Sequence, residues 1–154
     1  MEKLSTILEI VKDRMELGSM NTFYNALMAA ELEDFKGDGP MTVFAPFDPA
    51  FDKLPENYMN ELLNNPDKTK LKRLLQRHVI ADIAVRTKNL NETETKLKSV
   101  AGVELVLTNP ARRQVIIEFP TLHTSDKAAA VMPEILASNG VIYIVDTVLN
   151  SEEL

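Results

Sequence analysis

The first half of the chain is dominated by apolar residues that recur every three or four positions, the spacing of one face of an α-helix. Capping residues and prolines divide this half into segments, and we predict helices over residues 5–14, 21–35, 49–54, 58–63 and 67–79. The last of these carries an apolar stripe that includes a histidine, His78. The amino-terminal half is therefore predicted to be largely helical.

Strand signals dominate the second half. We predict strands over residues 103–107, 114–119, 128–132 and 141–145, because these runs are short, apolar and bounded by turn-forming residues. One earlier strand, residues 41–45, lies between two prolines. Residues 87–98 are polar without a consistent period, which predicts a loop or an irregular strand. Because helices and strands are segregated along the chain, the predicted class is α+β and not a doubly wound parallel sheet.

Composition limits the number of domains and the classes of partner. The 154 residues, of which 45% are hydrophobic, suit a single domain spanning residues 1–154. No apolar run is long enough for a transmembrane segment. The formal net charge of -6 argues against a nucleic-acid partner, which requires clustered lysine and arginine. The chain has no cysteine, which excludes disulfides, thiolate metal sites and thiol nucleophiles.

Several residues that could carry chemistry are more simply explained by the fold. Asp48 precedes a proline where a strand meets a helix, so its carboxylate is expected to cap that new helix. His78 lies on an apolar stripe, which favours a buried imidazole hydrogen-bonded to the backbone over a ligand-binding one. Asn139 and Gly140 predict a turn, because glycine tolerates positive φ and asparagine is the next best residue there.

No established catalytic motif is present. The sequence lacks the nucleophile elbow, the zinc-protease helix motif, the P-loop and the dinucleotide-binding glycine pattern. His123 and Asp126 have metal-ligand spacing, but no second histidine lies near them, so a solvated loop is favoured. A local basic face consists of Lys68, Lys70, Lys72, Arg73 and Arg77. Such a face can attract an anionic glycan or lipid head group, although a solvated helix surface is the simpler explanation. The sequence therefore predicts no catalytic site, cofactor or metal.

Two longer stretches resemble the signatures of the fasciclin (FAS1) domain family. Residues 42–51, TVFAPFDPAF, are similar to its first signature, in which a strand reading TVFAP is followed by an Asp or Asn and an Ala-Phe pair. Residues 137–149, ASNGVIYIVDTVL, are similar to its second signature, the strand that closes the domain. Between them, residues 74–79 occupy the place of the family's Leu-Leu, Tyr-His and valine residues. The order and spacing of these motifs agree over essentially the whole chain.

The resemblance implies a fold and a function. The implied fold is a wedge or sandwich of about seven strands with helices packed around it. The implied role is a non-enzymatic, monomeric module for adhesion or recognition at a cell surface or in the extracellular matrix, with a protein or glycan as partner. The alternative is a carrier or sensor domain that binds a small ligand, either a lipid or a glycan. A location inside the cell is compatible with this alternative. The resemblance implies an extracellular or cell-surface location, although residues 1–12 lack the features of a signal peptide.

Three positions depart from the family pattern. Phe47 stands where threonine is usual, Arg77 replaces the tyrosine that precedes the histidine, and Tyr143 stands where many members have histidine. The Tyr-His pair has been tied to integrin-mediated adhesion in animal members, so Arg77 argues against transferring that activity. Arg77, His78 and Tyr143 are nevertheless the candidate interaction residues that the resemblance marks. Residues 133–135 faintly resemble another adhesion motif proposed in the family.

Overall fold

The computed structural model describes residues 6–16, 20–30, 40–54, 57–120 and 124–149. Its α-helices are α1 (Ile7–Glu16), α2 (Asn21–Ala30), α3 (Asp48–Phe51), α4 (Tyr58–Asn64) and α5 (Thr69–Gln76). Its strands are β1 (Met41–Pro46), β2 (Val79–Ala81), β3 (Thr95–Lys98), β4 (Glu104–Thr108), β5 (Ile116–Pro120), β6 (Ser125–Ala129), β7 (Ile135–Ala137) and β8 (Gly140–Val145). Two short 3₁₀ helices, η2 (Thr87–Asn89) and η3 (Pro110–Arg112), lie between strands.

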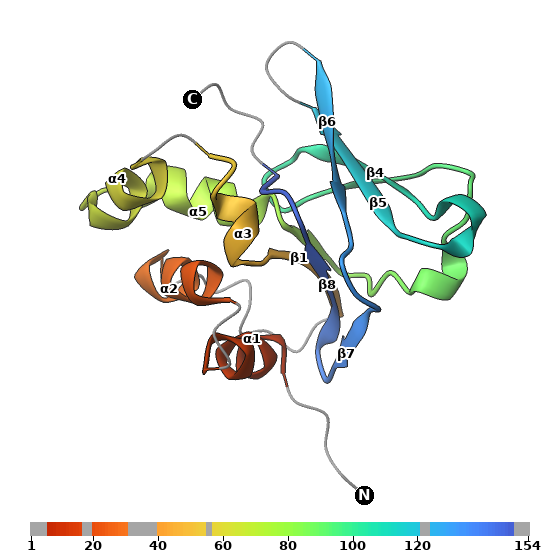
Figure 1. The fold of residues 1–154 in the computed structure, drawn as a ribbon, viewed down its shortest axis with the longest axis horizontal. Coiled ribbons are helices and arrows are strands. Elements are labelled where there is room, and N and C mark those ends of the chain that lie inside the picture. Colours follow the sequence, from red (N-terminus) through yellow and green to blue (C-terminus); the bar gives the residue numbers. More distant parts are fainter. Residues whose placement is uncertain (1–5, 17–19, 31–39, 55–56, 121–123, 150–154) are drawn as a thin grey trace, which may run out of the picture.

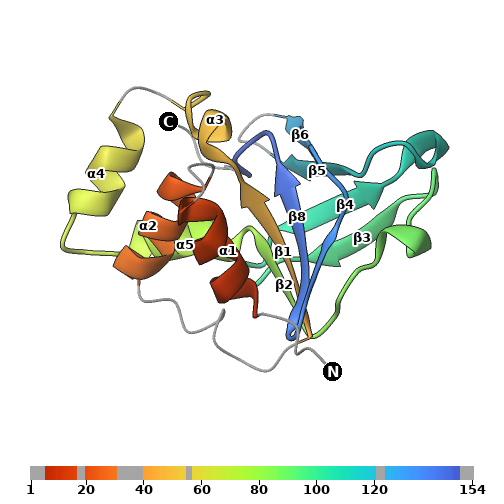
Figure 2. The same ribbon diagram turned by 60° about the horizontal axis from the view of Figure 1, so that its bottom comes forward.

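The strands form two sheets within the described residues, each with four strands, in the orders β2-β1-β8-β7 and β3-β4-β5-β6. In the first sheet β1 and β8 are parallel, so segments about a hundred residues apart lie side by side. Strands β2 and β7 flank this pair in the antiparallel direction, and the second sheet is antiparallel throughout. Figures 1 and 2 show the helices on one side of β1 and β8 and the second sheet on the other.

Strand β1 is buried at every residue, and β8 at every residue after its first. Alternate side chains point to opposite faces of a strand, so each of the two strands contributes to two cores. Val43 and Ile142 pack among the helices, whereas Phe44 and Tyr143 pack against the second sheet. The rings of Phe44 and Tyr143 stack with centroids 5.8 Å apart. Burial on both faces explains why these strands are almost continuously apolar.

The α+β class is confirmed, with eight strands in the described part instead of about seven. The helix predicted over residues 67–79 is too long, because α5 ends at Gln76 and Val79 begins β2. Val79 pairs with Val43 of β1, so the β-branched residues after Arg77 join the sheet and do not extend the helix. The predicted continuation of α2 beyond Ala30 lies outside the described residues.

The second sheet also differs in detail from the prediction. Residues 95–98, predicted as a loop or an irregular strand, form β3 at the edge of the sheet, where alternate residues are exposed. The strand predicted over residues 128–132 begins earlier and ends at Ala129, after which Ala130 forms a single bridge to Val145. Strand β7 was not predicted, since it is only three residues long. No helix among the described residues has the length and hydropathy to cross a membrane.

Candidate functional site

Asp48 caps a helix, but not the helix that its sequence position predicts. Helix α3 begins at Asp48 itself, and no side chain caps it. The carboxylate instead accepts hydrogen bonds from the backbone N–H of Thr22 at 3.0 Å and from the side-chain amide of Asn21 at 3.3 Å. The predicted cap is wrong because Pro49 has no N–H and the N–H of Ala50 already donates to the carbonyl of Phe47. Asp48 therefore fixes the start of α2.

Replacing Asp48 by alanine should lower the free energy of unfolding by about 1 kcal/mol, because α2 loses the acceptor at its first turn. Asp48→Asn keeps an acceptor and should lose less. Urea denaturation of both variants measures the difference. Asp52→Ala, which removes a carboxylate that is exposed and close in sequence, serves as the control and should change stability little. Equal stabilities of Asp48→Ala and Asp52→Ala would show that the cap contributes nothing.

Asn139 is a second cap of the same long-range kind. Its side-chain oxygen accepts from the backbone N–H of Ile7, the first residue of α1, at 2.9 Å. The pairing of Ala137 with Gly140 leaves Ser138 and Asn139 as the turn between β7 and β8, so the predicted turn lies one residue earlier than expected. Gly140 is the first residue of β8, and it is needed there because the backbone of Met41 passes close by.

His78 is 1% exposed and joins two distant segments. Its Nε2 accepts from the backbone N–H of Leu149 at 2.9 Å, which leaves Nδ1 to donate to the carbonyl of Leu74 at 2.8 Å. The pKa of His78 is lowered to about 4, chiefly by burial; the hydrogen bond to the carbonyl of Leu74 opposes this lowering, and the charge of Arg77 adds to it. The imidazole is therefore neutral and holds the end of α5 against the segment after β8, as its place on an apolar stripe predicts.

Arg77 does not belong to the exposed basic face. It is 5% exposed, whereas Lys70, Lys72 and Arg73 are exposed along α5. Lys68 is partly buried and donates to the carbonyl of Leu63. The predicted face therefore loses its last member, because the chain turns inward where α5 ends.

His123 and Asp126, which have metal-ligand spacing, cannot be compared as a pair, because His123 lies outside the described residues. Within the described residues no group of three or more His, Cys, Asp or Glu side chains is placed to hold a metal ion.

Tyr143 is buried in the core between the sheets and fixes a connecting segment. Its hydroxyl donates to the carbonyl of Val85 at 2.7 Å and lies 3.1 Å from the hydroxyl of Thr87. Burial raises the pKa of Tyr143 to about 12, so the phenol is protonated at neutral pH. Glu134, from the stretch that resembles an adhesion motif, binds Arg86 Nε with both carboxylate oxygens, at 2.9 and 3.1 Å. Arg77, His78 and Tyr143 thus serve the interior and do not meet in one surface site.

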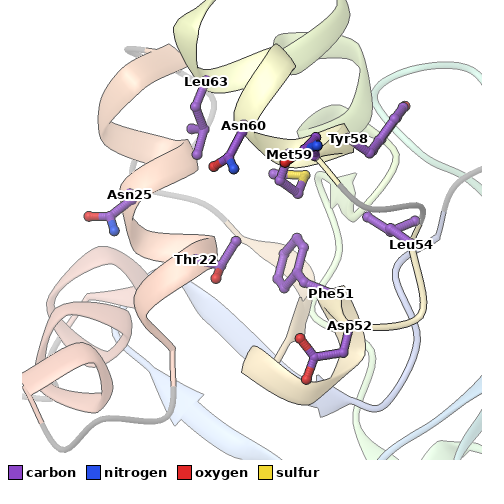
Figure 3. Close-up of a pocket in the computed structure, with 10 residues that line it drawn as sticks. Thr22, Asn25, Phe51, Asp52, Leu54, Tyr58, Met59, Asn60 and Leu63 are labelled. Carbon is purple, nitrogen blue, oxygen red and sulfur yellow. The ribbon is translucent and has the colours of Figure 1, made fainter.

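A cleft of about 620 Å³ opens between α2, α3 and α4. Figure 3 shows the ring of Phe51 among the lining side chains, beside Thr22 of α2 and below Met59 of α4. Phe51 and Met59 are partly buried and form an apolar floor. The carboxylate of Asp52 and the amide of Asn60 add exposed polar groups around this floor. The described residues of the lining include no basic side chain, and they offer an aromatic surface with neutral and acidic hydrogen-bonding groups.

None of the cleft residues was predicted to be functional. Phe51 and Met59 lie in the short helices predicted over residues 49–54 and 58–63, where aromatic and aliphatic residues are ordinary. The sequence feature that could have indicated the cleft is the number of asparagine side chains on these short segments: Asn25, Asn57 and Asn60. These asparagines indicate a binding site only when the structure shows that the three helices lie together.

Comparisons with known proteins bear on the family and the fold of this chain. The Fasciclin domain matches residues 18–151. An uncharacterized protein of Synechocystis sp. is 32% identical over 130 residues, covering 84% of this chain and 87% of that protein. The transforming growth factor-beta-induced protein ig-h3 of Sus scrofa is 27% identical over 148 residues, covering 95% of this chain but 20% of that protein. The chain thus spans a fifth of that relative.

A solved structure shares the fold. The FAS1 domain pair from the insect cell adhesion molecule fasciclin I superposes with a TM-score of 0.62 at 19% sequence identity, over 88% of this chain and 46% of that one. At this identity the likeness concerns the fold alone. The sequence match over residues 18–151 confirms the resemblance carried by the two signature strands. The chain therefore belongs to the fasciclin domain family.

Proposed function

We propose that the chain is a monomeric, non-enzymatic recognition module that binds a neutral glycan at a cell surface or in the extracellular matrix, through the cleft between α2, α3 and α4. The observation that carries the proposal is the half-buried ring of Phe51 in a cleft lined by hydroxyl, amide and carboxylate groups. The apolar face of a sugar ring can pack on an aromatic side chain. Its hydroxyls can donate to Asp52 and exchange hydrogen bonds with Asn60.

The family supports a role in recognition. One structural relative is described as a cell adhesion molecule, and the side chains of the signature motifs in this chain already have structural bonds. Asp48 and Asn139 cap helices, and His78 and Tyr143 hold backbone carbonyls. The fold is thus a scaffold whose binding groups must come from its surface, and the cleft presents such groups together.

The dimensions and charge of the cleft favour a neutral glycan over a protein or an anionic glycan. A volume of about 620 Å³ suits a small ligand or a short stretch of a larger one, because ligand sites commonly measure a few hundred Å³. Protein partners are usually held by broader surfaces. None of the described lining residues is a cation that could pair with sulfate or carboxylate groups. Binding should therefore resist salt, since screening acts on interactions between charges.

An array of glycans and matrix proteins, probed with the labelled chain at low and at physiological salt, tests the proposal. Neutral oligosaccharides are expected to bind at both salt concentrations. Phe51→Ala should weaken that binding by a factor of about ten, the effect of losing about 1.4 kcal/mol of packing. Asn60→Ala removes an exposed amide and should weaken it less, without disturbing the fold.

Asn64→Ala is the matched control, because Asn64 is exposed on α4 but does not line the cleft. It should bind like the unmodified chain. Binding to matrix proteins alone would contradict the glycan assignment and favour protein recognition. Glycan binding that is unaffected by both Phe51→Ala and Asn60→Ala would exclude this cleft as the site.

A further inference from the structure

A second pocket, of about 370 Å³, lies away from the helical cleft, among the segments that connect the strands. It is bordered by Thr87, by residues 109 and 113–115, and by residues 130–134, with Tyr143 among its lining residues. These segments come from three separate parts of the chain. The pocket therefore depends on the closed fold and is not a feature of one loop.

Hydrogen bonds hold the walls of this pocket in place. Glu134 accepts from Arg86 Nε and from the backbone N–H of Thr87 at 3.1 Å. On another side the amide of Gln114 donates to the carbonyl of Ala130 at 2.9 Å. Groups fixed before a ligand arrives do not have to be ordered when it binds, which favours affinity.

One buried acceptor at this pocket has no donor. Asn109 is 3% exposed, and its side-chain oxygen Oδ1 makes no hydrogen bond in the described structure. Asn109 also lines a neighbouring hollow with Asn91 and Ala111, so this residue borders two depressions. Buried polar groups of native proteins nearly always have partners, and an unpaired one requires an explanation. A ligand hydroxyl would supply the missing donor.

One exposed cation also borders the pocket. Arg113 lines it, and its guanidinium forms no ion pair or hydrogen bond within the described part of the chain. Glu134 is the other charged residue among the described lining residues, and its charge is matched by Arg86. Arg113 therefore leaves the pocket locally positive on a protein whose net charge is -6. Local charge of this kind favours an anionic ligand.

We propose that this pocket binds a small hydroxylated carboxylate of the size of a uronic acid. The carboxylate pairs with Arg113, and a hydroxyl donates to Oδ1 of Asn109. Met132 and Pro133 cover the apolar face of the ligand. This site is independent of the glycan cleft, because the two share none of their described lining residues.

Glucuronate, with glucose as its neutral counterpart, tests this assignment by calorimetry and by amide chemical shifts of the ¹⁵N-labelled chain. Glucuronate should bind at least tenfold more tightly than glucose and should shift the amides of Thr87, Gln114 and Met132. Arg113→Gln should reduce its affinity to that of glucose. Lys72→Gln removes an exposed cation from α5 and should leave the affinity unchanged.

Asn109→Ala separates a binding role from a structural one. The substitution removes an acceptor that has no partner in the unliganded chain, so stability should be unchanged or higher while glucuronate affinity falls at least tenfold. Lower stability with unchanged affinity would assign Asn109 to the fold and overturn the proposal. The proposal would also fail if glucuronate gave no shifts, or if Arg113→Gln left its affinity intact. Shifts confined to α2 and α4 and lost in Phe51→Ala would place the ligand in the helical cleft instead.

Discussion

Gly140→Ala is expected to destabilise the chain by at least about 3 kcal/mol, the upper end of the usual cost of overpacking. A Cβ at this position would lie 2.0 Å from the carbonyl oxygen of Met41 and 2.9 Å from its carbon. Both atoms belong to the backbone of β1, so no change of side-chain rotamer can relieve the contact. Relief requires β1 and β8 to separate at the end of their parallel pairing, which both cores share.

Gly102→Ala is the matched control for this substitution. Gly102 has a φ of +84° and no atom within 4 Å of its hypothetical Cβ. Alanine there should therefore cost only the penalty of a left-handed backbone conformation, about 1–2 kcal/mol. Urea denaturation of the two variants compares the same chemical change with and without the close approach. If Gly140→Ala were no less stable than Gly102→Ala, the approach of Met41 would not be what requires glycine at position 140.

The elements that the sequence predicts well are those specified by local pattern. Helix α1 follows from apolar spacing and from Thr6, whose hydroxyl accepts from the N–H of Glu9 while the Glu9 carboxylate accepts from the N–H of Thr6. Strand β2 was not predicted because it depends on a long-range pairing and not on a local pattern. It continues the apolar stripe of α5 without interruption, and only pairing with β1, more than thirty residues earlier, makes it a strand.

The roles of the polar residues depend on contacts that no local pattern contains. Asp48 and Asn139 each accept from a backbone N–H, of Thr22 and of Ile7, that lies 26 and 132 residues away in the chain. The aromatic cleft and the pocket at Asn109 were not foreseen for the same reason. Each joins segments that are unremarkable by themselves, and their chemistry arises from the packing that brings them together.

Between pH 7 and pH 5 the chain should lose about 2 kcal/mol of unfolding free energy through His78 alone. The folded-state pKa of about 4 lies below the ordinary value of 6.5, so as the pH falls below 6.5 the unfolded chain takes up a proton that the folded chain does not. The contribution is complete above pH 6.5 and is lost as the pH falls towards 4. Protonation would also place a donor on Nε2 against the N–H of Leu149, where the structure requires an acceptor.

Urea denaturation at pH 7, 6 and 5 measures this loss above the range in which most carboxylates titrate. His78→Gln should be less stable than the unmodified chain at pH 7 but should lose little further stability by pH 5. His123→Gln, which removes the other histidine, should keep the full dependence. An NMR titration of the His78 ring gives its pKa directly, and a value near 6.5 would contradict the argument. A low value is expected because the ring is enclosed and both nitrogens already have partners in the neutral form.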